Sequence, residues 1–477
     1  MSALVSIIRR FYSTDRMVRP EQVRGEIIGT GDAYKTLIRI ALPSVLELVL
    51  MSLIGAADTI MVAALGPAAI AAVSLTGQPR MIVLSIFFAL NIGVTAIVAR
   101  RKGQDRQEDA NRTLRNALVM GFALSLVVMV LALAFARPLL LLAGANEDMI
   151  GWSVEYFTIL AWFLPINALT MCINAAQRGV GNTKLAMYVN LTANTVNIIF
   201  NYLLIGGNFG FPRLEVAGAA YATGIGFVVG FVLCIISLYQ GRRRNHFLRI
   251  TRTDSWRLDK PTVASIVKIG GSAMWEQLGL RIGFFAYAAI VASLGTEVFA
   301  AHAVAMTFLN ISFNFGDGVG IAGTSLVGQM LGKERPDLSV VYGKCSQRIA
   351  ITVSLGLAAV FISFRYLFVG FFVNPVEDAN VYLMAVNLMF MVAAFQPVQT
   401  SSIVISGCLR GAGDNLYVSL VMAICVVLIR PVLSSVAIFA LGWGIMGAWG
   451  ASIMDTTTRF ILVYRRFNGG KWHDRKV

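Results

Sequence analysis

Twelve long apolar runs constrain this 477-residue chain more than any other feature. A helix that crosses the roughly 30 Å apolar core of a bilayer needs about 20 such residues. Backbone groups inside lipid must be satisfied internally, which favours helices for runs of this length. The sequence therefore predicts an all-α polytopic membrane protein. Its spans are expected at 37–65, 69–99, 113–136, 154–178, 184–206, 215–240, 262–293, 297–331, 340–366, 376–409, 415–441 and 445–467.

Composition excludes the other classes that a basic chain suggests. Hydrophobic residues make up 57% of the chain and charged residues only 14%, whereas a typical soluble domain is about 25% charged. High apolar content also excludes intrinsic disorder. The formal charge of +15 therefore does not indicate a nucleic-acid binder, and we expect no nucleic-acid partner.

The placement of the basic residues predicts the orientation of the chain. Of the 40 Lys and Arg residues, 34 fall in the segments on one side of the predicted spans and three on the other. Basic residues favour the cytoplasmic side, so both termini are expected there, in agreement with an even number of spans. Attraction to anionic membrane lipids follows from the same charges. The remaining three, Arg80, Arg281 and Arg430, lie inside predicted spans.

An internal repeat divides the chain into halves. Residues 43–103 align with residues 272–332 at an offset of 229, with 13 identities in 61 positions, and Glu47 falls on Glu276. Two RGxG elements, at 178–182 and 410–414, also correspond. Each half holds six predicted spans, so both insert the same way up, as parallel repeats do. We expect two six-helix lobes with a cleft that opens alternately to each side of the membrane.

This repeat predicts a domain plan with five parts. They are a cytoplasmic N-terminal segment (1–36), an N-lobe (37–240), a cytoplasmic linker (241–261), a C-lobe (262–467) and a cytoplasmic tail (468–477).

Asp58 is the leading functional candidate. It lies in the outer half of the first span, with no basic residue within two helical turns along the chain. Ionisable residues inside membrane spans are costly and mark functional sites by default. An unpaired carboxylate there takes up a proton, or binds Na⁺ together with other oxygen ligands. The alternative is a structural acid that is hydrogen-bonded to backbone or to a Thr.

Four amides in the fifth span share one helical face, because Asn190, Asn194, Asn197 and Asn201 follow one another at spacings of 4, 3 and 4. Amides facing lipid are expensive, so this face is predicted to point inward. Its carbonyl groups either help to hold a cation near Asp58 or make interhelical hydrogen bonds. Asn174 and Thr223 are expected to join the same cluster.

Further polar groups lie at membrane depth. Glu47 and Glu276 occupy equivalent positions, and each either binds a cationic substrate or coupling ion or is neutralised structurally. Arg281 and Gln399 are candidate residues of the same substrate cleft. Arg430 and Asp455 lie at similar depths in the last two spans and are predicted to form a structural ion pair. Weaker candidates are Arg80, Asp317 and His302, the last of which is expected near the membrane surface.

The sequence lacks the residues that several kinds of chemistry require. There is no Walker A motif and no zinc-binding arrangement of the three His residues, and the loops are too short for a catalytic domain. The five Cys residues have no CxxC spacing and are expected to be reduced and packed. We therefore expect no enzyme activity, no cofactor, and no metal other than Na⁺ near Asp58.

The chain resembles the MATE (multidrug and toxic compound extrusion) family over about residues 35–467. The resemblance rests on residues 58–62 ahead of Leu65-Gly66, on residues 300–302 after Leu294-Gly295, on the two RGxG elements, and on Asp455 with Arg459. It implies that Asp58 is the acid used for ion coupling, with Asn174, Asn197 and Thr223 as its polar partners. Asn201 stands where many members have an acid.

The resemblance also implies a function. Members are antiporters of the cytoplasmic (inner) membrane that expel organic cations in exchange for Na⁺ or H⁺ by alternating access, and we expect a monomer. Some members use acids of the seventh and tenth spans instead; here Glu276 matches the first, while the tenth span has Gln399 and no inward acid. The alternative function is a lipid-linked oligosaccharide or lipid flippase of the same superfamily, which would need several Arg residues in the cleft.

Overall fold

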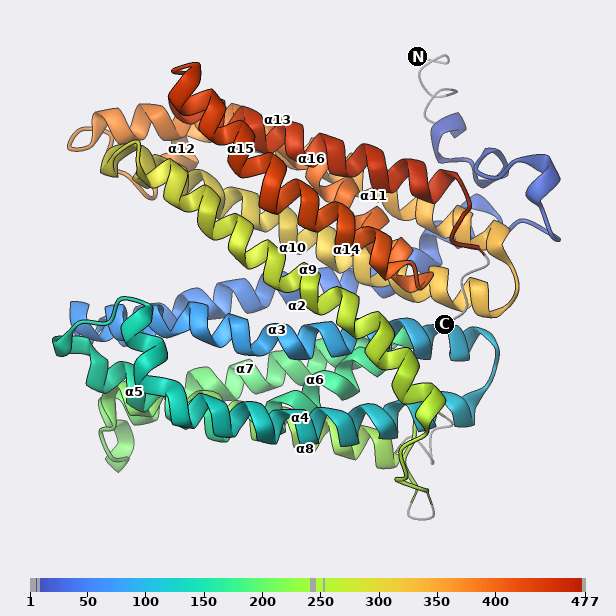
Figure 1. Cartoon of the computed structure of the whole chain (residues 1–477), viewed down its shortest axis with the longest axis horizontal. Helices are drawn as coiled ribbons and strands as arrows, with labels where there is room; N and C mark the ends of the chain where they lie inside the picture. The colour runs from blue at the N-terminus through green and yellow to red at the C-terminus, as the bar shows by residue number, and fades with distance from the viewer. Residues whose placement is uncertain (1–5, 7–8, 241–245, 252–253, 474–477) are drawn as a thin grey trace. The chain divides into compact units, whose positions relative to one another are not determined.

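A computed structural model describes residue 6 and residues 9–240, 246–251 and 254–473 of the chain (Figure 1). Within these residues the structure has helices and no strands. Eight helical segments are long and apolar enough to cross a membrane, and a bent helix pair makes a ninth. Three more long helices carry additional polar or charged side chains and bring the layout to twelve. The prediction of an all-α, twelve-helix membrane protein is confirmed.

The helices of the first half follow the predicted spans closely but extend further into the polar ends. They are α2 (Thr30–Ala63), α3 (Pro67–Gly103), α4 (Gln107–Leu142), α5 (Glu147–Trp162), α6 (Leu164–Gly179), α7 (Thr183–Gly206) and α8 (Glu215–Gln240). The predicted span 154–178 is the bent pair α5 and α6, which meet at an angle of 53°. Pro165 lies in the first turn of α6, where its missing N–H costs no helical hydrogen bond.

The second half repeats this order with one irregular member. Its helices are α9 (Lys260–Ala292), α10 (Thr296–Gly332), α11 (Pro336–Ser363), the short α12 (Arg365–Gly370), α13 (Ala379–Gly411), α14 (Asn415–Ala423), α15 (Arg430–Ser435) and α16 (Gly444–Asn468). Two π-helical segments, η4 (Ile424–Ile429) and η5 (Val436–Ala440), flank α15 on either side. The short 3-10 helices η1 (Thr14–Arg16), η2 (Pro20–Gln22) and η3 (Asn208–Gly210) complete the described elements.

The described chain divides into two compact units whose boundaries lie inside helices. Unit 1 is Met1–Val45 with Trp275–Val477, and unit 2 is Leu46–Met274. The first half of α2 therefore belongs with the C-terminal helices, and the first half of α9 with the N-terminal helices. The lobe boundaries at 37 and 262 stay a prediction.

The glycines of the two RGxG elements explain why these elements are repeated. A Cβ on Gly179 would lie 2.8 Å from the Thr95 carbonyl oxygen, and one on Gly411 would lie 2.1 Å from that of Thr324. Both contacts are far too close, so these glycines allow α6 to pack against α3 in unit 2, and α13 against α10 in unit 1. The second glycine of each element has a positive φ, +86° and +85°, which ends the helix.

The segment before α2 packs against the other residues of unit 1. The sequence alone predicted only a cytoplasmic extension here. Met17 is 1% exposed, and its carbonyl oxygen accepts a hydrogen bond from Lys344 Nζ at 2.6 Å. The corresponding segment before α9 contacts unit 2, where Asp254 forms an ion pair with Arg115 at 3.2 Å. Lys344 and Arg115 are 229 residues apart, so the repeat also includes these two attachments.

Candidate functional site

Asp58 lies on α2 within unit 2, and two amides of α7 surround its carboxylate. Asn201 Nδ2 donates to Asp58 Oδ1 at 2.7 Å. The Asn197 amide fits with its nitrogen towards Asp58, where it donates to Oδ1 at 3.0 Å and to Oδ2 at 3.1 Å. Asn197 and Asn201 are 4% and 1% exposed. The helical spacing of four therefore brings two buried amides to one carboxylate, as the sequence predicted for this face of the helix.

Thr223 of α8 completes the polar contacts of this cluster. In the same orientation of Asn197, the amide oxygen lies 3.1 Å from the Thr223 hydroxyl, which itself donates to the Ala219 carbonyl oxygen at 2.9 Å. Tyr156 of α5 is buried beside the cluster and interacts electrostatically with Asp58. We call Asp58, Asn197, Asn201 and Thr223 the Asp58 cluster; its members come from α2, α7 and α8.

Arg80 of α3 lies within electrostatic reach of Asp58. Among the described residues it makes no ion pair with Asp58 within 4.0 Å, and its Nε is buried without a hydrogen-bond partner. Sequence inspection considered only basic residues on the same helix, and none lies within two turns. The fold supplies a cation from the neighbouring helix instead, so Asp58 is less isolated than its own helix indicates.

Asn174 does not contact Asp58 and belongs to a second network in unit 2. Its Nδ2 donates to Asn190 Oδ1 at 3.2 Å, and Asn190 Nδ2 donates to Glu47 Oε1 at 2.5 Å. Asn194 donates to the carbonyl oxygen of Asn190, one turn earlier on its own helix. The four-amide face is thus divided, with Asn190 serving Glu47 while Asn197 and Asn201 serve Asp58.

Glu47 and Glu276 each form an ion pair with the arginine of an RGxG element. Arg178 Nη2 pairs with Glu47 Oε1 in unit 2, and Arg410 Nη2 pairs with Glu276 Oε1 in unit 1. Both carboxylates are almost fully buried, with side chains 1% exposed. Ser419 donates to Glu276 Oε2 at 3.1 Å. Sequence analysis identified the Glu pair and the RGxG pair separately, and the fold makes them partners.

A larger charge cluster in unit 1 is centred on Asp455. Arg430 Nη2 lies 2.8 Å from Asp455 Oδ2, and Arg459 Nη2 lies 3.4 Å from the same oxygen. Gln399 Oε1 accepts a hydrogen bond from Arg459 at 3.2 Å. The expected pair of Arg430 with Asp455 is therefore part of a triad in which one carboxylate serves two guanidinium groups. Among the described residues, Arg281 of α9 makes no ion pair with this triad, and its Nε is buried without a partner.

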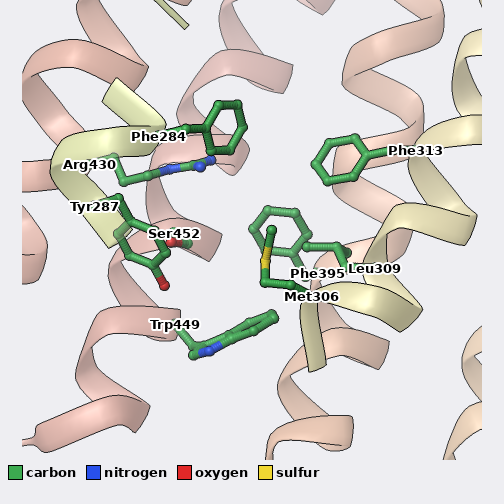
Figure 2. A pocket seen from close by; sticks show the side chains of 9 residues that line it. All are labelled: Phe284, Tyr287, Met306, Leu309, Phe313, Phe395, Arg430, Trp449 and Ser452. Carbon is green, nitrogen blue, oxygen red and sulfur yellow. The ribbon is translucent and has the colours of Figure 1, made fainter. Parts of the chain in front are cut away.

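An aromatic pocket in unit 1 lies beside this triad (Figure 2). Arg430 is its one charged lining residue, and the guanidinium lies 5.1 Å from the ring centroid of Phe284 and 5.6 Å from that of Tyr287. His302 lies near the start of α10, as expected, but it packs against the rings of Tyr287 and Trp449 and is 6% exposed, so its side chain is buried within the protein. The lining residues are Phe284, Tyr287, Met306, Leu309, Phe313, Phe395, Arg430, Trp449 and Ser452.

Asp317 is the remaining acid of a membrane-length helix. It lies near the middle of α10, is exposed, and interacts electrostatically with Arg410. No group of three or more His, Cys, Asp or Glu residues that could hold a metal ion occurs in the part of the chain that the structure describes.

Repeated bundles of membrane-length helices that keep buried charges in matching positions define a membrane transporter. The family model MatE matches residues 43–203 and 273–436. The chain therefore belongs to the MatE family, the multidrug and toxic compound extrusion transporters that the sequence resembles, and it is a multi-pass membrane protein.

Relatives and solved structures agree with this assignment. An uncharacterized transporter of Bacillus subtilis, YisQ, is 24% identical over 443 residues, which cover 92% of this chain and 95% of that protein. A probable multidrug resistance protein of Pseudomonas putida, NorM, is 27% identical over 429 residues, 87% of this chain and 90% of that protein. A multidrug resistance MATE family transporter in an outward-facing conformation has the same fold, with a TM-score of 0.84 at 20% identity over 94% of this chain and 98% of that one.

Proposed function

We propose that this chain exports amphipathic organic cations across the cytoplasmic membrane in exchange for Na⁺ or H⁺, and that the coupling ion binds at the Asp58 cluster. The observation that carries the proposal is a membrane-depth carboxylate held by two buried amides and a hydroxyl from neighbouring helices. Similar proteins named as probable multidrug resistance proteins support the substrate class.

The amides give the cluster two states. With a charged, ion-free Asp58, both amide nitrogens face the carboxylate, as in the contacts given above. Turning an amide by half a rotation presents its oxygen instead, which accepts a hydrogen bond from a protonated carboxyl group or ligates Na⁺. Asn201 Oδ1 is buried without a partner in the present orientation. The amides of the cluster now donate through their nitrogens. Their oxygens remain available to bind an incoming cation after the amides rotate.

Export follows if binding of the ion opposes binding of the drug. By linkage, an ion that weakens drug binding is itself weakened to the same degree by the drug. Ion entry from outside then releases the drug there, and departure of the ion to the cytoplasm restores drug affinity on the inner side. This cycle requires Asp58 to change its charge or its partner in each turnover.

Efflux from vesicles tests the proposal. Vesicles containing the full chain are loaded with a fluorescent organic cation, and Na⁺ and H⁺ gradients are imposed separately. We expect the wild-type chain to respond to at least one gradient and Asp58→Asn to respond to neither. Asp148→Asn, which removes an exposed acid from the start of α5, is the matched control and should export normally. Undiminished coupled export by Asp58→Asn would refute the assignment.

A further inference from the structure

We propose that unit 1 contains a second ligand site, the aromatic pocket of Figure 2, and that this site binds aromatic carboxylates with Arg430 as the anion-binding group. The inference goes beyond the proposed cation export and does not depend on it. Every residue that carries it lies in unit 1.

The internal repeat places this pocket at the position of the Asp58 cluster. The offset is 229 at residues 43–103 and again at Gly218 with Gly447, but it is 232 at the RGxG elements between them. With an offset of 229, residues 58, 201 and 223 correspond to Tyr287, Arg430 and Ser452, and all three line the pocket. The contacts correspond as well. Asn201 touches Asp58 in unit 2, and the Arg430 guanidinium packs on the Tyr287 ring in unit 1. The same construction therefore occurs twice, once around an acid and once around a base.

The charge near the pocket is positive because Asp455 is shared. Arg430 and Arg459 both use Asp455 Oδ2, while Oδ1 of this fully buried side chain has no partner. Glu276, which interacts electrostatically with Arg459, is committed to Arg410. Asp317 also lies near Arg410 rather than among the lining residues. No acid is among the lining residues, so an entering group meets the Arg430 guanidinium, whose counter-charge Asp455 is shared with Arg459.

Arg430 retains donors for a ligand. Within the described part of the chain, its hydrogen bonds come from Nε and Nη2, to Asp455 and Thr456. Nη1 is therefore the donor that the proposal assigns to the ligand. A guanidinium recognises a carboxylate through paired N–H donors in one plane, and such charge-assisted bonds are among the strongest in proteins. A cationic ligand would instead meet Arg430 at close range in a poorly hydrated site.

The rest of the lining selects an aromatic ring. Phe313, Phe395 and Trp449 lie across the pocket from Arg430, from elements α10, α13 and α16 (Figure 2). Aromatic side chains prefer offset or edge-to-face contacts with another ring, which a flat ligand provides. The cavity has a volume of about 10 Å³ in this structure, room for about one water molecule. Binding of a ring therefore requires several lining side chains to move, the flexible Met306 among them.

The backbone around Arg430 is also unusual. The π-helical segment η4 ends directly before α15, and η5 begins directly after it. Arg430 is the first residue of α15. The equivalent helix of unit 2, α7, is a continuous α-helix. π-helical turns are rare and occur frequently at functional sites. The distortion is thus confined to the half of the repeat that carries the buried base.

Calorimetric titration of the purified full chain in detergent tests the proposal with three probes of one shape. These are naphthoate, the neutral naphthylmethanol and the cationic naphthylmethylammonium. We expect naphthoate to bind at least about ten-fold more tightly than the neutral alcohol, as is typical for a hydrogen bond to a charged group. The cation also reports on the proposed export site, so the comparison that decides is naphthoate against the alcohol. Equal binding of these two probes, or no binding of naphthoate, would overturn the proposal. This comparison uses the wild-type chain and therefore does not depend on any variant folding.

Two substitutions locate the site and separate it from a merely structural role. Arg430→Gln should reduce naphthoate affinity at least about ten-fold. Partition of the probe into detergent is the same for both proteins, so the difference between wild type and variant corrects for it. Arg459→Gln is the comparison variant, since it removes the other guanidinium of the triad but none of the pocket lining. It leaves Asp455 to Arg430 alone and should therefore reduce naphthoate affinity, but less than Arg430→Gln does. An equal loss in both variants would assign the effect to the triad and refute the pocket. Asp58→Asn should not alter naphthoate binding, so failure of either proposal leaves the other standing.

Discussion

The Asp58 cluster of unit 2 and the aromatic pocket of unit 1 occupy equivalent positions of the repeat and have opposite charge. In unit 2 the central group is an acid with two amides. In unit 1 a tyrosine replaces the acid and Arg430 replaces an amide. These two exchanges, one on each of two helices, are enough for this difference. On the two proposals above, the repeat fixes where a ligand site forms, while individual side chains decide which charge it accepts.

The features that do not differ between the halves are the ones that hold the helices together. Glu47 with Arg178 and Glu276 with Arg410 keep both sign and geometry. Removing one partner of such a pair leaves a charge uncompensated in a buried position, which is strongly destabilising. Conserving the pairs in both halves is consistent with a structural task, whereas the reversed charges mark the positions where ligands differ.

Exchanging the charged residues of the two sites should have the largest effect on their charge preference. The double variant Arg430→Asn with Tyr287→Asp copies the Asp58 and Asn201 arrangement into unit 1. We expect it to lose naphthoate binding at least about ten-fold and to prefer naphthylmethylammonium, because the cation now meets an acid and no base. The three-probe titration measures the change of order. Retained preference for naphthoate would show that other groups of unit 1 set the charge selectivity.

Breaking the matched ion pairs should affect stability about equally in the two units. Arg178→Gln and Arg410→Gln each leave a buried glutamate unpaired, and we expect each to cost about 3 kcal/mol. Thermal unfolding in detergent measures the loss, with the exposed Arg465→Gln as the control. Adding Glu47→Gln to the first variant, or Glu276→Gln to the second, should restore most of the stability. If only one unit responds, the two pairs do not share a structural task.

Adding an acid to unit 2 should increase the difference in charge between the Asp58 cluster and the aromatic pocket. Asn201→Asp places a second carboxylate opposite Asp58, where two like charges cannot both remain uncompensated without a bound cation or a proton. We expect the Na⁺ concentration for half-maximal efflux to fall about ten-fold, equivalent to one pKa unit of interaction. The efflux assay under a Na⁺ gradient measures it. An unchanged Na⁺ dependence would indicate that protons alone drive the cluster.

The helices and their duplication could be predicted from the sequence, because apolar periodicity is a local signal and a repeat is visible by comparing the chain with itself. Apolar runs predicted the twelve helices, and the offset of 229 predicted their duplication. The spacing of Asn197 and Asn201 predicted that both reach one side of a single helix. Interactions between helices distant in sequence could not be predicted in this way. Arg178 was counted as a loop residue because nothing in its own segment indicates Glu47, which is 131 residues away.

Other misses come from backbone geometry and from packing between helices. The π-helical segments around Arg430 depend on a shift of hydrogen-bond partners that leaves no regular pattern in the sequence. His302 was expected near the surface from its place in α10, yet rings from α9 and α16 cover it. Arg80 was set aside because its relation to Asp58 depends on how α3 packs beside α2. In each case the missing information was tertiary packing rather than residue type.

The smallest expected effect concerns the last matched pair, the segments that precede α2 and α9. Lys344 holds the first through the Met17 carbonyl oxygen, which does not titrate, whereas Arg115 holds the second through Asp254, which does. Burial alone would raise the pKa of Asp254, but hydrogen bonds from Thr251 and the charge of Arg115 keep it below its usual value. A lowered pKa means that the contact stabilises the folded state fully at neutral pH.

That stabilisation is lost as the pH falls through the ordinary aspartate range, about 4, towards the lowered value. Asp254→Asn should therefore lower the melting temperature at neutral pH by only about 1 °C, since the amide oxygen can still accept the hydrogen bonds from Thr251 and Arg115. Glu108 also pairs with Arg115, at 2.6 Å, and limits the loss. The gap between wild type and variant should close in acid, while the gap for Lys344→Met should stay constant over the same range. A gap for Asp254→Asn that widens as the pH falls would contradict the sign, because it would require the protonated carboxyl group to be the form that the fold prefers.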